Sequence, residues 1–208
     1  MKEEIGHIGL EVPEDMPDMF LNSILLDLNT EGLKFQVRKR PELGATAALE
    51  WILPTAIITY IFKSYFDGFL TEAGKDHYII LKKWLKIVAN NGRLVKITTV
   101  YATQSLDKQP SNNTQSKSFS ILLQTKNNKI IKLLFDDDLE KEDWDNAIDQ
   151  LLDFAIEHYE KIPNDNLTKE LERFVQNKRS TVYAVIDKKS KKLRFYDERE
   201  LIQLQRQK

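Results

Sequence analysis

Apolar and polar positions alternate near the start of the chain in a way that predicts two short strands with a helix between them. Residues 5–12 have the spacing of an extended segment, which Pro13 ends because proline lacks a backbone donor. In residues 16–28 apolar side chains recur at intervals of three and four, the period of a helix, and in residues 33–38 they alternate again. Residues 4–40 are therefore predicted to form a β-α-β unit with parallel strands.

The most apolar and aromatic stretch follows, and its spacing predicts two central helices within residues 44–90. Pro54 removes one amide and bends the first helix, and Gly74 interrupts the segment. Asp76 is then placed to cap a second helix over residues 77–89. The first helix is predicted from a stripe at helical spacing that consists of Ile57, Ile58, Ile61, Phe62, Tyr65, Phe66 and Phe69. We expect this segment to supply the core.

A membrane anchor at residues 45–62 is the alternative interpretation of the same stretch. Its uncharged part, residues 51–62, is much shorter than the ~20 residues that a spanning helix needs. Glu50, the only charge in the longer stretch, costs ~3 kcal/mol near the centre of a bilayer. A buried core helix is therefore favoured over a membrane anchor.

The second helix is predicted to end at Gly92, and beyond it the apolar positions recur at every second residue, the period of a strand. Residues 93–136 are predicted to form a β-meander. Residues 126–129, between its last two strands, include two asparagines, which tolerate the positive φ of a tight turn. The polar residues 103–117 are predicted to form a mobile loop, and whether this loop orders on binding is left open. The predicted strands of the meander are 95–101, 119–123 and 131–135.

The last third of the chain predicts helices, a hairpin and a short polar helix. Residues 138–159 carry the most regular helical stripe, and Asn164 or Asp165 can cap a further helix, so helices are expected over 138–178. Residues 181–208 are predicted to form a hairpin and a short helix. The chain as a whole predicts a single α+β domain, with a mixed or antiparallel sheet of about seven short strands packed on the bent central segment and on the 138–159 helix.

Composition narrows the functional classes. The 31 basic and 32 acidic residues among 208 nearly cancel, which argues against a surface that is electrostatically attractive to nucleic acid everywhere. The lack of cysteine excludes disulfides, thiolate metal ligands and a cysteine nucleophile. Gly6 and Gly9 interrupt the apolar run that a signal peptide needs. We expect a soluble cytoplasmic protein, and the abundance of Lys, Asn and Ile favours a bacterial source.

One cluster of potentially reactive side chains lies around the glycine-rich break near residue 74. Carboxylate and imidazole groups together can transfer protons or bind a divalent metal near neutral pH. Their spacing matches no established ligand or nucleophile motif, so an exposed turn is the favoured interpretation. The members of this candidate catalytic cluster are Asp67, Glu72, Lys75, Asp76 and His77.

No other acidic or histidine pattern indicates a site. Residues 136–138 are three aspartates, and acidic residues are expected at the start of a helix because they complement its dipole. His7 and His158 are isolated, and a lone histidine is more often structural than catalytic. Neither a phosphate-binding glycine loop nor a metalloprotease motif occurs, so the sequence predicts no cofactor and no metal.

The charge pattern singles out the C-terminal hairpin. Residues 136–172 contain 14 acidic and 3 basic side chains, whereas residues 178–208 contain 10 basic and 4 acidic ones. Basic residues on a turn can contact phosphates, although a solvated turn beside an acidic helix is the simpler interpretation. The candidate nucleic-acid contacts are Lys188, Lys189, Lys191, Lys192 and Arg194.

The sequence favours a non-enzymatic interaction or regulatory protein whose partner is a protein, because no spaced polar motif indicates a reaction. A small hydrolase or nuclease using the Asp67–His77 cluster is one alternative. Nucleic-acid binding through the basic hairpin is the second, and membrane association through residues 45–62 is the third. The sequence does not indicate the oligomeric state.

Overall fold

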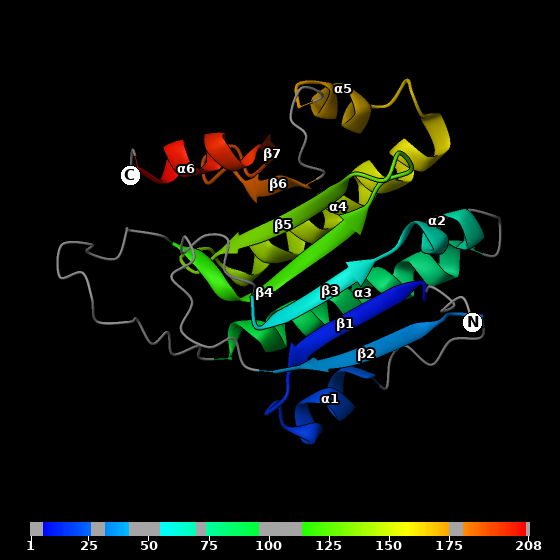
Figure 1. Ribbon diagram of the computed structural model, residues 1–208, viewed down its shortest axis with the longest axis vertical. Coiled ribbons are helices and arrows are strands. Elements are labelled where there is room, and N and C mark those ends of the chain that lie inside the picture. Colours follow the sequence, from blue (N-terminus) through cyan, green and yellow to red (C-terminus); the bar gives the residue numbers. More distant parts are fainter. Residues whose placement is uncertain are drawn as a thin grey trace.

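A single mixed sheet organises the chain. The computed structural model of the protein (Figure 1) describes residues 6–25, 32–41, 55–69, 74–95, 114–174 and 181–206. Within them, seven strands lie in the order β2-β1-β3-β4-β5-β6-β7, and parallel and antiparallel neighbours alternate across the sheet. The strands are β1 (Ile8–Pro13), β2 (Phe35–Arg40), β3 (Ile57–Ile61), β4 (Gln115–Gln124), β5 (Ile130–Asp136), β6 (Thr181–Ile186) and β7 (Leu193–Tyr196). The predicted α+β class is confirmed.

Helices cover the two faces of the sheet unequally. In Figure 1, α3 and α4 run behind the strands, and α1 packs beside α3. The second face carries α6, which packs on β6 and β7 through a small apolar cluster of Leu134, Val185 and Leu201. None of the helices in the described ranges is long and apolar enough to cross a membrane. The helices are α1 (Asp18–Leu25), α2 (Lys63–Phe69), α3 (Gly74–Arg93), α4 (Lys141–Lys161), α5 (Asn166–Glu172) and α6 (Glu198–Arg206).

The β-α-β opening is confirmed: β1 and β2 are parallel and α1 connects them, with Leu10 opposite Val37. A second parallel pair, β3 and β4, is connected by α2 and α3, and a third, β5 and β6, by α4 and α5. Each of these helical connections begins and ends on neighbouring strands, which is the usual solution for a parallel crossover.

The prediction of a helix through residues 57–69 is wrong in its first half. Ile57–Ile61 is a strand near the middle of the sheet, and only the following α2 is helical. Ile57 and Ile61 belong to the main core while Ile58 is buried on the other face, so the strand is apolar throughout. Periodicity cannot distinguish such a fully buried strand from a buried helix. The predicted bend at Pro54 lies outside the described residues.

The second central helix is confirmed, but its ends are not where the pattern placed them. Gly74 is the first residue of α3, so Asp76 lies in the first turn of the helix and is not its N-cap. Gly92 lies inside α3, which continues to Arg93. A Cβ atom at Gly92 would lie 3.1 Å from Cβ of Phe119, so this glycine allows the helix to approach β4 closely.

The β-meander over residues 93–136 is only partly correct. β4 and β5 form the predicted hairpin, in which Asn128 has a positive φ of 63°. The other side of β4 pairs with β3, so no position remains beside β4 for a strand at 95–101, of which residues 96–101 lie outside the described residues. The predicted loop 103–117 lies outside them up to residue 113, and Gln115 already belongs to β4.

The C-terminal elements agree with their predictions, with one correction. Asp165 caps α5 by accepting a hydrogen bond from the Thr168 amide, and β6 and β7 form the expected hairpin. Asp136 is the buried last residue of β5, where it accepts a 2.7 Å hydrogen bond from the Thr114 hydroxyl. It therefore terminates a strand and does not complement the dipole of α4.

Two tryptophans centre the core between the sheet and its helices. Trp84 of α3 donates to the carbonyl of Ile24 at 2.6 Å, and Trp144 of α4 donates to the carbonyl of Asp136 at 3.1 Å. The ring of Trp144 also stacks on Phe135 with centroids 4.3 Å apart. Each indole thus fills the core and has its polar atom satisfied, as buried tryptophan requires.

Candidate functional site

The predicted cluster around residue 74 is divided between two helices. Asp67 is exposed near the end of α2, while Asp76 is exposed and His77 half-buried in the first turn of α3. Glu72 and the side chain of Lys75 lie outside the described residues. In the described ranges, no three acidic or histidine side chains come together as a metal site would require. The described members of the cluster thus lie at least partly exposed around the start of α3.

The basic hairpin lies against the acidic start of α4. Nζ of Lys191 is 2.7 Å from Asp143, and Nζ of Lys188 is 2.5 Å from Asp138. Arg194 lies 3.7 Å from Asp187 within the hairpin itself. Lys189 and Lys192 are exposed. The two charge blocks seen in the sequence thus partly neutralise one another, which reduces the positive charge that the hairpin presents to a phosphate.

His158, which the sequence left as an isolated residue, is part of a buried hydrogen-bond network. Its Nε2 accepts from the Lys126 amide at 3.3 Å, so the ring proton resides on Nδ1 and is donated to Asp165 at 3.0 Å. The Thr168 hydroxyl donates to the second oxygen of Asp165 at 2.6 Å. The network joins the β4–β5 turn to α4 and α5. Its only sequence signal is a histidine and an aspartate seven residues apart, on either side of a proline.

The environment of Asp165 favours its charged form. Burial raises the pKa of Asp165, but hydrogen bonds from Thr168 and His158 outweigh burial, so the pKa lies below its usual value. Since all the polar atoms of His158 and Asp165 are engaged with protein groups and both side chains are fully buried, a substrate has no access to them. This histidine–aspartate pair is structural.

The second face of the sheet carries a group of polar side chains near β1, β3 and β4. Arg40 reaches over β1, pairs with Glu11 at 3.3 Å and donates to the carbonyl of Thr55. The hydroxyls of Thr55 and Ser120 lie 2.5 Å apart. These polar groups bond to one another within the protein, and the bonds hold Thr55, two residues before β3, against β4 and the end of β2.

Lys132 on β5 differs from these groups, because its ammonium group forms no hydrogen bond or ion pair with any of the described residues. It lies opposite Leu122 of β4 and Tyr183 of β6. Burial and then the positive charge of Arg40 lower the pKa of Lys132 to about 8. In the sequence this residue is simply a polar position in an alternating strand, which gives no signal of its burial.

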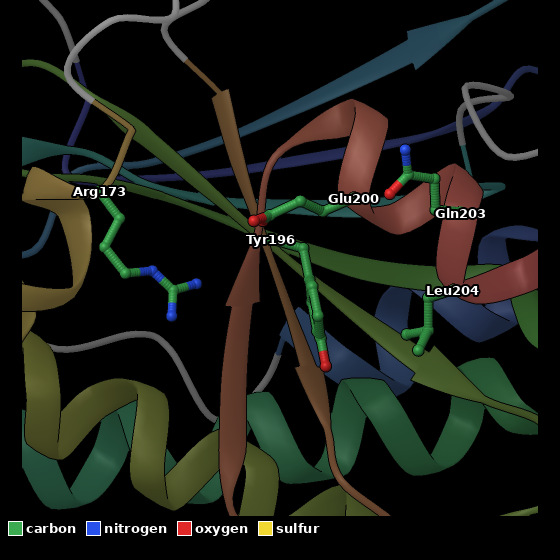
Figure 2. A pocket seen from close by; sticks show the side chains of 5 residues that line it. All are labelled: Arg173, Tyr196, Glu200, Gln203 and Leu204. Atoms are coloured by element: carbon green, nitrogen blue, oxygen red, sulfur yellow. The ribbon is translucent and has the colours of Figure 1, made fainter.

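A shallow pocket of about 310 Å³ lies where α5, β7 and α6 meet. Figure 2 shows Tyr196 of β7 between Arg173 on one side and the α6 residues on the other. Two of its polar groups already have partners: Arg173 donates to the carbonyl of Phe195 at 2.8 Å, and Glu200 accepts from the Asp197 amide at 3.1 Å. The remaining lining residues are Gln203 and Leu204.

The contacts of Arg173 belong to a larger feature, the blocking of the β7 edge. β7 is the last strand of the sheet, and its outward-facing groups meet side chains. Gln150 of α4 accepts from the Leu193 amide at 2.9 Å and donates to the carbonyl of Lys191 at 2.7 Å. With Arg173 on the Phe195 carbonyl, these bonds occupy the outward amide of Leu193 and the outward carbonyl of Phe195, two of the groups to which a further strand would pair.

The opposite edge, β2, has no comparable covering side chains among the described residues. The carbonyls of Lys34 and Arg40 accept from β1-side amides, so the even-numbered residues of β2 pair with β1. By the alternation of a parallel ladder, the amide and carbonyl of Val37 and of Lys39 point away from the sheet. The side chains from Gln36 to Lys39 are exposed on both faces. Within the described part of the chain, β2 is thus an edge strand with no partner strand on its outer side.

Comparison with known proteins adds no further assignment. No family model, no curated protein and no solved structure matches the chain.

Proposed function

We propose that the protein is a non-enzymatic interaction protein that binds an extended acidic segment of a partner protein along the edge of β2. The observation that carries the proposal is the difference between the two edges of the sheet. A strand added at β2 would pair with the outward amides and carbonyls of Val37 and Lys39, whereas on β7 the Leu193 amide and the Phe195 carbonyl are occupied by Gln150 and Arg173.

Charge supports an acidic partner. Residues 32–41 contain four basic side chains and no acidic one. Lys39 pairs with Asp18 at 3.1 Å in an exposed contact, and Arg40 pairs with Glu11. Arg38 is exposed and forms no ion pair within the described part of the chain. A neighbouring strand with acidic side chains would place its charges beside Arg38 and Lys39, where cross-strand pairs of opposite charge are favourable.

The same charges disfavour a second copy of this chain as the occupant. Pairing two β2 strands would bring two sets of Arg38, Lys39 and Arg40 onto adjacent strands, and like charges across strands are destabilising. Basic residues on an edge strand are a common device against self-association. The proposed binding is therefore selective for a strand of opposite charge.

The test uses the 208-residue chain and a labelled peptide in which pairs of neighbouring glutamates are separated by valines, so that acidic side chains lie on both faces of the added strand. A peptide with lysine in place of glutamate is used for comparison. Fluorescence anisotropy should show that the acidic peptide binds and the basic peptide does not, and that the affinity for the acidic peptide falls as the salt concentration is raised. The double variant Arg38→Glu, Lys39→Glu should bind it about tenfold more weakly, since each exposed charge pair contributes ~0.2–1 kcal/mol and a reversal adds repulsion. Arg194→Glu, on the blocked edge, is the matched control and should bind like the wild type.

A second variant separates backbone pairing from charge. Val37→Pro removes an outward amide and keeps every charge, so it should abolish peptide binding while near-ultraviolet circular dichroism stays unchanged. Equal binding of the acidic and basic peptides, or undiminished binding by Val37→Pro, would exclude the proposal. Sedimentation that shows a dimer broken by Val37→Pro would instead identify a second copy as the occupant.

A further inference from the structure

Lys132 occupies an unusual position for a lysine, on the second face of the sheet, with three strands between β5 and β2 and one between β5 and β7. Its row across this face runs through Tyr60 on β3, Leu122 on β4 and Tyr183 on β6. The side chain is half-buried by these neighbours, and Tyr183 itself packs against the small cluster under α6. The amine therefore lies beside apolar and aromatic groups and has lost much of its hydration.

The charges that face this amine do not compensate for the lost hydration. Arg40 is the charged group near enough to act on Lys132, and it carries the same sign. Two carboxylates on the same face have other partners: Glu11 is engaged with Arg40, and Asp136 accepts from Thr114 and lies 3.9 Å from Nζ of Lys188. Tyr60 and Tyr183 are neutral near pH 7. No hydrogen bond or ion pair from Nζ of Lys132 to any described residue is present, and Nζ is not among the polar atoms that are sealed from solvent without a partner.

An amine that is poorly hydrated, unpaired and still in contact with solvent has the properties of a nucleophile. We propose that Lys132 is a modification site that takes an acyl group from small activated acyl donors such as acyl phosphates. The Nζ lone pair attacks the acyl carbon and forms the amide bond. The carbon–oxygen bond to phosphate breaks, phosphate leaves with the electron pair, and the amine proton passes to water. The proposal does not require the peptide binding proposed at the β2 edge, although Arg40 at the end of β2 is the charge that acts on Lys132.

The lowered pKa of Lys132 supports this geometry. With a pKa of about 8, roughly a quarter of the Lys132 amines are neutral at pH 7.5, against about one in a thousand for an ordinary lysine. Only the neutral amine has a lone pair to donate. Partial burial slows the approach of the donor, and a less basic amine is a weaker nucleophile, so the net advantage is smaller than the ratio of neutral fractions.

The experiment treats the full-length protein with acetyl phosphate and measures acetylation of each lysine by peptide mass spectrometry. Lys189, exposed at the hairpin turn, is the internal reference. At pH 7.5 Lys132 should react about tenfold faster than Lys189, and its rate should level off above pH 8 to 9 while that of Lys189 continues to rise. Equal rates at pH 7.5, or a Lys132 rate that rises in parallel with Lys189 up to pH 10, would overturn the proposal.

Two variants distinguish an activated amine from one that is merely accessible. Arg40→Met removes the like charge and Leu122→Ser admits water, so each should raise the pKa of Lys132 and slow its acetylation severalfold at pH 7.5. At pH 10.5, where about half or more of the amine is neutral in every variant, the rates should differ by no more than about twofold. Acetylation of Lys132 at pH 7.5 that is unchanged in both variants would contradict the proposal, and Lys189 should react equally in all three proteins.

Discussion

The two edges of the sheet solve the same problem in different ways. At β7, side chains from α4 and α5 bond to the outward amide of Leu193 and the outward carbonyl of Phe195. At β2, the strand stays accessible and carries Arg38 and Lys39. Hydrogen bonds from side chains can block an edge strand, or charged side chains on the strand can disfavour its self-association. An edge of the second kind can still pair with a strand of opposite charge.

The largest loss of stability is expected from replacing His158. Its hydrogen-bond network holds α5, and Arg173 at the end of α5 bonds to the β7 edge. His158→Ala leaves Asp165 buried with one partner fewer and the Lys126 amide without an acceptor. We expect a loss of about 3 kcal/mol in the free energy of unfolding, measured by urea denaturation. Glu160→Gln, an exposed change on the same helix, is the control. A loss below 1 kcal/mol would contradict the structural role of the network.

Proline substitutions in β2 test which residues face outward. Arg38→Pro removes an amide that pairs with β1 and should cost about 3 kcal/mol, whereas Val37→Pro removes an outward amide and should cost less than about 1 kcal/mol. The two variants change neighbouring positions of one strand, so each serves as the control of the other. Equal losses in thermal or urea unfolding would show that the assignment of the outward positions is wrong.

Opening the β7 edge should have a smaller effect on stability and a visible effect on association. Gln150→Leu leaves the Leu193 amide without its acceptor, which costs about 2 kcal/mol for a partly buried donor. The exposed amide would also permit pairing with another chain, so sedimentation should detect concentration-dependent association. The control is Gln203→Leu on α6, away from the edge of the sheet. It should match the wild type in both unfolding free energy and sedimentation.

The charge of Asp165 should give the same network a dependence on pH. Its pKa is lowered in the folded protein, so the unfolded chain binds more protons between the two pKa values and stability rises with pH there. The difference in unfolding free energy between the wild type and Asp165→Asn should be complete above about pH 5 and should shrink as the pH falls below about 4. A difference that stays constant down to pH 2 would contradict the assigned ionisation.

The smallest effect is expected at the hairpin ion pairs. Lys191→Met removes the contact with Asp143, a partly exposed pair, and should change the free energy of unfolding by about 0.5 kcal/mol, less at high salt. Lys189→Met, at an exposed position of the same turn, should change it by less. A loss of 2 kcal/mol or more for Lys191→Met would mean that this pair does more than neutralise charge.

The amino-acid sequence by itself determined the elements whose hydrophobic pattern is one-sided. The stripe of α4 and the alternation of β4 and β5 were predictable because the apolar side chains that enter the main core recur at the period of a helix or a strand, and the Asp165 cap was predictable from its residue type. It did not determine β3, whose residues are buried on both faces and so have no period to read. The candidate catalytic cluster and the candidate nucleic-acid contacts were likewise predicted only from residues that are neighbours in the sequence.

Only the tertiary structure decided which strands lie beside one another, and every candidate site depends on that order. Lys132 is unusual because Leu122, Tyr183 and Arg40 come from three other strands. Gln150 and Arg173 close one edge because α4 and α5 pass beside β7, while β2 has no such neighbour among the described residues. Local spacing sets the secondary structure through a few adjacent residues, but pairing, burial and electrostatic environment arise between residues far apart in the chain, whose positions no local pattern contains.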